Sequence, residues 1–239
     1  MSRLLFPQSA FVPIVGLELP AIANLSFATF LGNGTINSKD ATNIAPGGGA
    51  FTLIGQGPSY GLNYGSVQSP SNALQTPMID TGDAHTIVWV THAVPSGKFA
   101  ASMHFETATT VTNLNQLWQS GAPVMRCGSG PLTTSAGTMD IPLVTDTTKW
   151  NLLAFVTKGG KPLAGYNLTT GRTVASPTPV VLAARPVAGN WFIGGTSGSY
   201  TNPSDVAFAL GANTEMSATD LNVLANALRY PLRDREIYV

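Results

Sequence analysis

The 239-residue sequence has little charge. Only 10% of its residues are charged, and 12 basic residues balance 12 acidic ones, so the formal net charge is zero. Proteins that hold nucleic acid or an anionic membrane surface by electrostatic attraction carry a basic excess. No apolar run reaches the roughly 20 residues needed to span a bilayer. We therefore expect no nucleic-acid partner and no membrane insertion.

Cysteine is almost absent, since Cys127 is the only one. A single cysteine excludes an internal disulfide and any zinc site built from several cysteines. The first residues, MSRLLFPQSAFVPIVGLELPAIA, also lack the uninterrupted apolar stretch of a secretion signal, because Pro7, Pro13 and Glu18 break it. We expect no signal peptide and no cofactor.

Short apolar segments rich in β-branched and aromatic residues recur along the chain, separated by clusters of Gly, Pro, Asn and Ser. This pattern predicts many strands joined by hairpins. Residues 85–92, HTIVWVTH, are apolar at both parities and predict a strand covered on both faces. The other predicted strands begin at Phe51, Trp150, Val180, Trp191 and Val206.

One helix is predicted near the end of the chain. Ser217 can cap it, Asp220 lies in its first turn, and Leu221, Leu224, Ala225 and Leu228 follow at helical spacing. We expect Pro231 to end it. Many strands followed by one late helix predict an all-β antiparallel sandwich, a jelly roll, with one short C-terminal helix.

The glycine-rich run IGGTSGS at 193–199 invites comparison with phosphate-binding loops. It has no lysine to bind phosphate, and the segment that follows is an apolar strand pattern, not a helix. We interpret it as a flexible loop between strands.

The end of the sequence resembles that of laminin-G-like, concanavalin-A-like jelly rolls. WFIGG from Trp191, VAFAL from Val206 and MSATDLNVLANAL from Met216 match the closing IGG, strand and helical turn of that family. TPMIDTGDAHTIVWVTHAV and KWNLLAFVTKGGKPLAGYNLTTGR resemble its early central strand and a later hairpin. The resemblance covers about residues 50–230 and implies an N-terminal arm over 1–45, a sandwich over 46–230 and a tail over 231–239.

Similar domains occur in tailed-phage virion proteins, whose charge-poor, Thr/Asn/Gly-rich composition this chain shares. The resemblance implies a structural or appendage protein in the head or tail of a virion assembled in the host cytoplasm. Its predicted partners are other virion proteins, further copies of itself as a homo-oligomer, and surface glycan. Because residues 11–27 are apolar without a clear period, we expect an extended arm there and a second assembly segment in the C-terminal tail. The alternative is that both ends cover the edges of their own sandwich.

Two patterns bear on catalysis. Glycoside hydrolases need a pair of carboxylates beside the scissile bond, but no strand carries E-x-D-x-E. Residues 57–61 satisfy G-x-S-x-G, yet no helix pattern follows as the nucleophile elbow requires. We predict a protein that is not an enzyme. A free carbohydrate-binding lectin is the first alternative, and a hydrolase with an unrecognised acid pair is the second.

Metal ligands are few. His85 and His92 have opposite strand parity, and they do not predict a shared site with His104. Asp80 and Asp83 are the only candidate calcium ligands, and a role in turns and caps is preferred because Ca²⁺ takes six to eight oxygens. We predict no metal.

Sugar binding combines aromatic faces with amide and carboxylate partners. Residues of this kind on predicted turns or in polar stretches are the candidate ligand-binding set: Tyr60, Asn63, Tyr64, Trp118, Tyr200 and Asn202. Trp89, Trp150 and Trp191 lie in apolar segments and are predicted to be core.

Overall fold

The computed structural model describes residues 19–32, 42–68, 71–79, 84–93, 100–107, 110–119, 125–131, 139–141, 146, 148–179, 190–194 and 203–239. Side chains are described outside 93, 100–107, 110–119, 125–131, 139–141 and 178. The predicted strand at Val180 and the candidates Tyr200, Asn202, Asp80 and Asp83 lie outside these residues.

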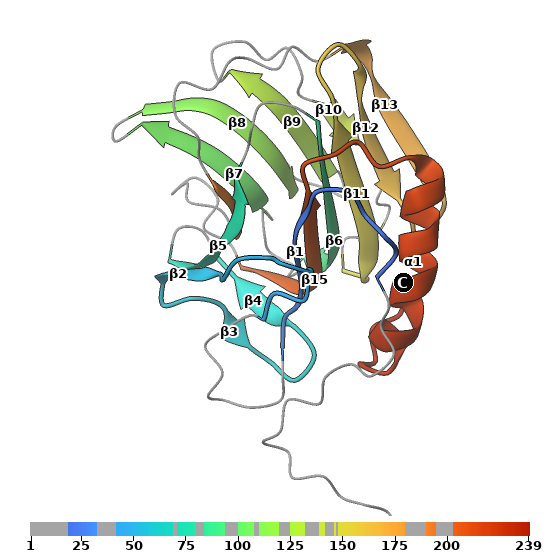
Figure 1. The fold of residues 1–239 in the computed structure, drawn as a ribbon. Coiled ribbons are helices and arrows are strands. Elements are labelled where there is room, and N and C mark those ends of the chain that lie inside the picture. The colour runs from blue at the N-terminus through green and yellow to red at the C-terminus, as the bar shows by residue number, and fades with distance from the viewer. Residues whose placement is uncertain are drawn as a thin grey trace, which may run out of the picture.

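The described part of the chain is built from strands and one C-terminal helix (Figure 1). The strands are β1 (Leu25–Phe30), β2 (Thr52–Gly55), β3 (Ser59–Tyr60), β4 (Gly65–Val67), β5 (Asn72–Ile79), β6 (His85–Ala93), β7 (Ala100–Thr107), β8 (Thr110–Gln119), β9 (Met125–Pro131), β10 (Met139–Ile141), β11 (Asn151–Thr157), β12 (Pro162–Asn167), β13 (Arg172–Pro179), β14 (Asn190–Ile193) and β15 (Ser204–Ala212); the helix is α1 (Ala218–Arg233).

The largest sheet runs β13-β12-β11-β6-β15-β4-β3, and every recorded pairing is antiparallel. Strand β15 is shared by three neighbours. Strand β6 pairs along one edge of it, while β1 and β4 follow one another along the other edge. The all-β antiparallel sandwich with one C-terminal helix is therefore confirmed.

A second layer faces this sheet. It consists of β14-β5-β2 and β10-β9-β8-β7, with β14 beside β7 (Figure 1). Between the layers lies a core in which Trp89 and Trp191 are buried, as predicted. The β14 strand ends at Gly194, which adopts φ 98° and whose added Cβ would lie 3.0 Å from the Val67 Cβ. Gly194 is therefore a packing residue at the end of β14, and residues 195–199 of the predicted loop lie outside the described residues.

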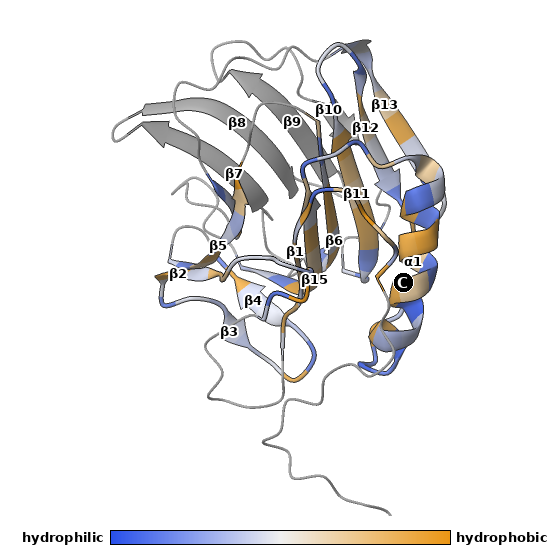
Figure 2. Cartoon of the chain, in the orientation of Figure 1, coloured by the Kyte–Doolittle hydropathy of each residue, from blue (hydrophilic) through white to orange (hydrophobic). Residues whose placement is uncertain are grey.

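Helix α1 covers the other face of the large sheet. Its buried residues include the predicted Leu221, Leu224, Ala225 and Leu228, which pack against Val88 and Val90 of β6. Hydrophobic residues accordingly lie on α1 and along the strands beneath it (Figure 2). Strand β6 is thus covered on both faces, as predicted, because His85, Ile87 and Trp89 face the other core.

The start of α1 follows the prediction and its end does not. The Ser217 side chain accepts from the Asp220 backbone N–H and the Asp220 carboxylate accepts in return, which is a capping box. The helix continues through Pro231 to Arg233. A proline has a helical φ, and near a C-terminus its missing N–H costs one hydrogen bond. Burial of Pro231 and Leu232 against the sheet outweighs that loss.

Both ends of the described chain contact the sandwich. Leu25–Phe30, within the predicted N-terminal arm, form β1 and pair with β15, so an extended arm is wrong for this part. In the C-terminal tail Ile237 is buried in the core under α1. Burial of apolar side chains and pairing of a strand edge explain both contacts. Leu25–Phe30 and Ile237 therefore agree with the alternative, in which the ends of the chain cover their own sandwich.

Candidate functional site

A row of polar and aromatic residues crosses four neighbouring strands on the helix-covered face of the large sheet. His92 near the end of β6 lies directly opposite Asp205 of β15, and Asp205 lies opposite Ser66 of β4. On the far side of His92, Trp150 precedes β11. We call Tyr64, Trp150, His92 and Asp205 the aromatic–acid cluster.

The rings of this cluster contact one another. The Trp150 and His92 ring centroids are 4.3 Å apart at 88°, and Tyr64 lies 5.8 Å from Trp150 and 6.2 Å from His92. His92 Nε2 lies 3.1 Å from the Asp205 carboxylate. The His92 side chain is 21% exposed and that of Asp205 is 10% exposed. The cluster therefore combines partly exposed aromatic rings with a carboxylate held in place by an imidazole.

A pair of asparagines holds the backbone beside Trp150. Asn151 Nδ2 donates to the Lys149 carbonyl over 2.7 Å, and Asn167 Nδ2 donates to Asn151 Oδ1 over 3.0 Å. Both asparagines are buried. Trp150 itself is only partly buried, which corrects the prediction that it is core. It precedes β11 and packs against the core under α1, with part of the residue still exposed.

Tyr64 is fixed by a turn and a close backbone contact. The Gly61 N–H donates to the Tyr64 carbonyl over 2.9 Å and closes the turn between β3 and β4. Gly32, at φ 88°, packs so tightly that an added Cβ would lie 2.1 Å from the Tyr64 nitrogen. Only glycine combines this left-handed conformation with such an approach.

Arg235 connects the C-terminal tail to the backbone beside Tyr64. Its guanidinium donates to the carbonyls of Leu31, Gly32 and Asn63 and lies over the Phe30 ring at 5.1 Å. Burial lowers the pKa of Arg235 to about 10. The guanidinium is therefore engaged with backbone oxygens beside Tyr64.

The cluster has the chemistry of carbohydrate recognition more than that of catalysis. An aromatic face packs on the C–H groups of a sugar while a carboxylate accepts from its hydroxyls. A Ser-His-Asp triad would need the serine hydroxyl within hydrogen-bond reach of the imidazole. Ser66 is two strands from His92, about 9 to 10 Å at the usual strand spacing. The arrangement therefore does not form such a triad.

Three of the six predicted ligand-binding residues have described side chains, and these three do not converge. Tyr60 packs against the core between the layers, whereas Tyr64 lies on the helix side. Asn63 contributes its carbonyl to Arg235. The backbone of Trp118 belongs to β8, opposite Ala100 and Arg126, and its side chain lies outside the described set. Of the three with described side chains, only Tyr64 belongs to the aromatic–acid cluster, and Tyr200 and Asn202 lie outside the described residues.

The serine of the G-x-S-x-G match and the acidic residues Glu215 and Asp220 take structural positions. Ser59, of the G-x-S-x-G match, lies in a hairpin followed by β4 and not by a helix. Glu215 binds Lys158 and Lys161 at 2.9 and 2.7 Å, and Asp220 belongs to the capping box. Those contacts lower the pKa of both carboxyls: Lys161 and then Lys158 for Glu215, and Ser217 for Asp220.

The two described histidine side chains follow the parity argument. His85 lies in the core between the layers beside Trp191, and His92 lies on the opposite face of β6. Within the described ranges, no group of three or more His, Cys, Asp and Glu residues is placed to hold a metal ion. The same ranges contain no helix long and apolar enough to cross a membrane.

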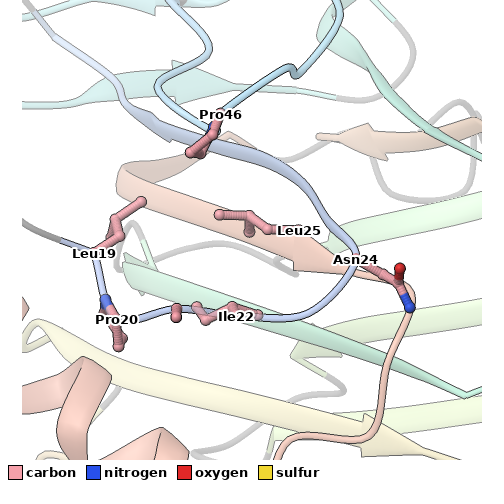
Figure 3. Close-up of a pocket in the computed structure, with 7 residues that line it drawn as sticks. Leu19, Pro20, Ile22, Asn24, Leu25 and Pro46 are labelled. Carbon is pink, nitrogen blue, oxygen red and sulfur yellow. The ribbon is translucent and has the colours of Figure 1, made fainter.

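A second candidate is a hollow of about 380 Å³ beside the first turn of the described chain (Figure 3). Its lining residues are Leu19, Pro20, Ala21, Ile22, Asn24, Leu25 and Pro46. None of the seven is titratable or nucleophilic. The hollow can therefore bury an apolar group but offers no catalytic chemistry.

Sequence reasoning missed His92, Trp150 and Asp205 as site residues. His92 and Trp150 were assigned to strands, and Asp205 was not singled out. The available signal was their position at strand ends, where a polar residue interrupts an apolar pattern. Their convergence depends on strand register, which pairs residues far apart in the chain.

No protein-family model matches the sequence, and no curated protein matches it. Solved structures do resemble the fold. Trypanosoma rangeli sialidase matches with a TM-score of 0.60 at 10% identity, over 91% of this chain and 35% of the sialidase. The binding domain of Paraclostridial mosquitocidal protein 1 matches with a TM-score of 0.59 at 7% identity, over 86% of this chain and 52% of that one.

A botulinum neurotoxin type C that depends on interaction with two ganglioside molecules to enter cells also matches. Its TM-score is 0.57 at 9% identity, over 87% of this chain and 52% of the toxin chain. The chain thus spans about a third to a half of the structures it resembles. At these identities the likeness supports a jelly-roll-like β-sandwich and nothing about activity.

Proposed function

We propose that this chain is a non-enzymatic glycan-binding sandwich module that contacts its sugar through the aromatic–acid cluster. The observation that carries the proposal is the row in which Trp150, His92 and Asp205 lie side by side, with His92 and Asp205 on adjacent strands and Trp150 directly before a third. The sheet positions the three residues, so their geometry exists before a ligand arrives, which lowers the cost of binding.

The neighbouring folds support the same class of ligand. One matched sialidase structure is a complex with sialic acid, and the matched type C neurotoxin interacts with gangliosides. This support is indirect because it comes from the fold. A free lectin module is the alternative setting for the same site, and a hydrolase with an unrecognised acid pair is the second alternative.

The virion setting is the finer part of the proposal. It is supported by the charge-poor, Thr/Asn/Gly-rich composition and by the resemblance to jelly rolls of tailed-phage particles. In that setting the module is a head or tail appendage that contacts other virion proteins and further copies of itself. Recovery of the protein in purified particles, detected by mass spectrometry, tests this part separately from glycan binding.

The glycan experiment uses the purified chain on a panel of immobilised oligosaccharides. The wild type should bind a subset, and Trp150→Ala should lose at least about tenfold in affinity, since an aromatic contact at a binding site is worth one to several kcal/mol. Tyr230→Ala is the matched control, because Tyr230 is an aromatic residue 66% exposed on α1 outside the cluster.

Asp205→Asn provides a second variant that keeps the shape of the site while removing the carboxylate. It should weaken binding as well. Binding that survives both changes, or the absence of binding to every glycan, would contradict the proposal. Release of reducing ends from any polysaccharide, abolished by changing one acidic residue, would contradict its non-enzymatic part.

A further inference from the structure

We infer that the aromatic–acid cluster selects neutral sugars and discriminates against sugars that carry a carboxylate, sialic acid included. The inference rests on the proposed function and names the ligand class of the same site. It is not what the matched folds suggest, since those include a sialidase bound to sialic acid.

The first step is the charge inside the cluster. Asp205 contributes a carboxylate that is 10% exposed, and His92 is its partner at 3.1 Å. If the imidazole is neutral the pair carries one negative charge, and if it is protonated the pair is neutral. In neither state does the pair present a net positive charge to a ligand.

The second step concerns the nearest arginine. A carboxylate-bearing sugar is usually held by an arginine whose fork of N–H groups faces it. Arg235 lies beside Tyr64, but it donates to the carbonyls of Leu31, Gly32 and Asn63. Turning it toward a ligand would leave these partly buried oxygens without their donor, which is costly.

The other described cations near Trp150, α1 and the hairpin β11–β12 are paired as well. Lys149, directly before Trp150, pairs with Asp146 at 3.6 Å, and Lys158 and Lys161 are both bound to Glu215. Arg229 donates to the Leu168 carbonyl and to Asn226. Among the described residues, these cations already have partners of their own. A ligand carboxylate at the cluster would therefore approach Asp205 without compensation, and like-charge contact at a binding site is strongly unfavourable.

A neutral sugar is not repelled by the Asp205 carboxylate. Its hydroxyls can donate to Asp205 and its apolar face can pack on Trp150, with Tyr64 beside the indole. The His92 contact keeps the carboxylate oriented on the sheet. Hydroxyl-rich ligands without charge thus satisfy each group of the cluster.

The test compares immobilised glycans that differ by one carboxylate: lactose with 3′-sialyllactose, glucosyl with glucuronosyl, and galactosyl with galacturonosyl beads. We expect the wild type to prefer the neutral member of each bound pair by at least about tenfold, which corresponds to 1.4 kcal/mol. The preference should shrink at 1 M salt, because screening shortens the reach of the repulsion. Asp205→Asn should reduce it even if overall affinity falls.

Equal or tighter binding of the acidic members overturns the inference while the proposed function stands, provided that binding still depends on Trp150. Retention of the full preference in Asp205→Asn also overturns it. Absence of binding to all six ligands and to the wider panel contradicts the proposed function itself, so the two failures are distinguishable.

Discussion

Gly32 has no functional group, yet the position of Tyr64 in the candidate site depends on it. Its φ of 88° is in the left-handed region, and an added Cβ would lie 2.1 Å from the Tyr64 nitrogen and 2.6 Å from the Asn63 carbonyl carbon. These are backbone atoms, which cannot move aside as a flexible side chain can. A substitution here therefore displaces the turn that carries Tyr64.

Gly32→Ala should lower the stability of the fold by more than left-handed strain alone, which costs on the order of 1 to 3 kcal/mol. It should also weaken glycan binding, since Tyr64 moves. Urea unfolding and affinity on the bound glycan measure both effects. Gly160→Ala is the control, because Gly160 has φ 75° but nothing within 4 Å of an added Cβ. Equal losses in the two variants would show that the contact with Tyr64 is unimportant.

Single residues were predictable from the sequence where local pattern decides their environment. The parity of residues 85–92 predicts that His85 and His92 face opposite sides, and the structure confirms it. The meeting of His92 with Asp205 was not predictable, because it depends on how β6 registers against β15. Trp150 was predicted to be core because it begins an apolar segment, but it is only partly buried.

Among the elements, the hairpin β11–β12 and the segment before α1 are connected by two ion pairs. Lys158 and Lys161 hold Glu215 at 2.9 and 2.7 Å. Lys161 and then Lys158 lower the pKa of Glu215 below its ordinary 4.5. The group is partly exposed, so solvent screening keeps the contribution small, at most about 1 kcal/mol for such surface pairs.

Glu215→Gln should lower the melting temperature slightly at neutral pH and not at acid pH. A carboxyl with a lowered folded pKa stabilises the fold fully above its ordinary pKa, and this stabilisation is lost as the pH falls through the folded value. The difference between wild type and variant, followed by thermal unfolding from pH 7 downward, should vanish on the acid side of 4.5. The double variant Lys158→Gln with Lys161→Gln should show the same pH-dependent loss of melting temperature as Glu215→Gln. A difference in melting temperature that persists in acid would mean that the packing of the Glu215 side chain, and not its charge, stabilises the fold.

Elements were predictable where a strong local signal exists. The capping pair Ser217 and Asp220 and the helical spacing of three leucines predicted α1. The end of α1 was predicted wrongly. Proline usually ends a helix, but that local rule does not account for the burial of Leu232 and Ile237, which favours continuation of the helix. Strand β1 was missed because its pattern is irregular, and only pairing with β15 makes it a strand.

At the scale of the whole molecule, the C-terminal tail stabilises the sandwich. Leu232, in the last turn of α1, and Ile237 are buried in the core between α1 and the sheet, and Arg235 bonds to the backbone of residues 31, 32 and 63. The division into an arm over 1–45, a sandwich over 46–230 and a tail over 231–239 stays a prediction. Residues 25–30 and 232–237 nevertheless share a core with the sandwich.

Deleting residues 231–239 should destabilise the whole domain. Truncating one buried leucine or isoleucine usually costs about 2 to 5 kcal/mol, and this deletion removes two. Denaturant unfolding by circular dichroism measures the loss. Tyr238→Ala is the control, since Tyr238 is 69% exposed. A truncated protein that keeps its stability and loses only self-association would restore the assembly role predicted for this segment.

The overall architecture was predictable because strand patterns, turn residues and one late helix agree on an all-β sandwich. The detailed topology was not. Three sheets, with β1 and β4 sharing one edge of β15, arise from long-range pairing. The local hydrophobic periodicity of a sequence does not show which distant strands pair.

The most direct test of the central claim is an NMR titration of the protein labelled with ¹⁵N at its four tryptophan indoles. Trp150→Phe identifies the Trp150 signal, and Trp89 and Trp191, exposed by 1% and 2%, serve as internal references. When the neutral glycan selected on the panel is added, the Trp150 signal should shift progressively while those of Trp89 and Trp191 stay in place. A glycan that binds without moving the Trp150 signal, or that moves only another indole, would contradict the assignment of the aromatic–acid cluster as the binding site.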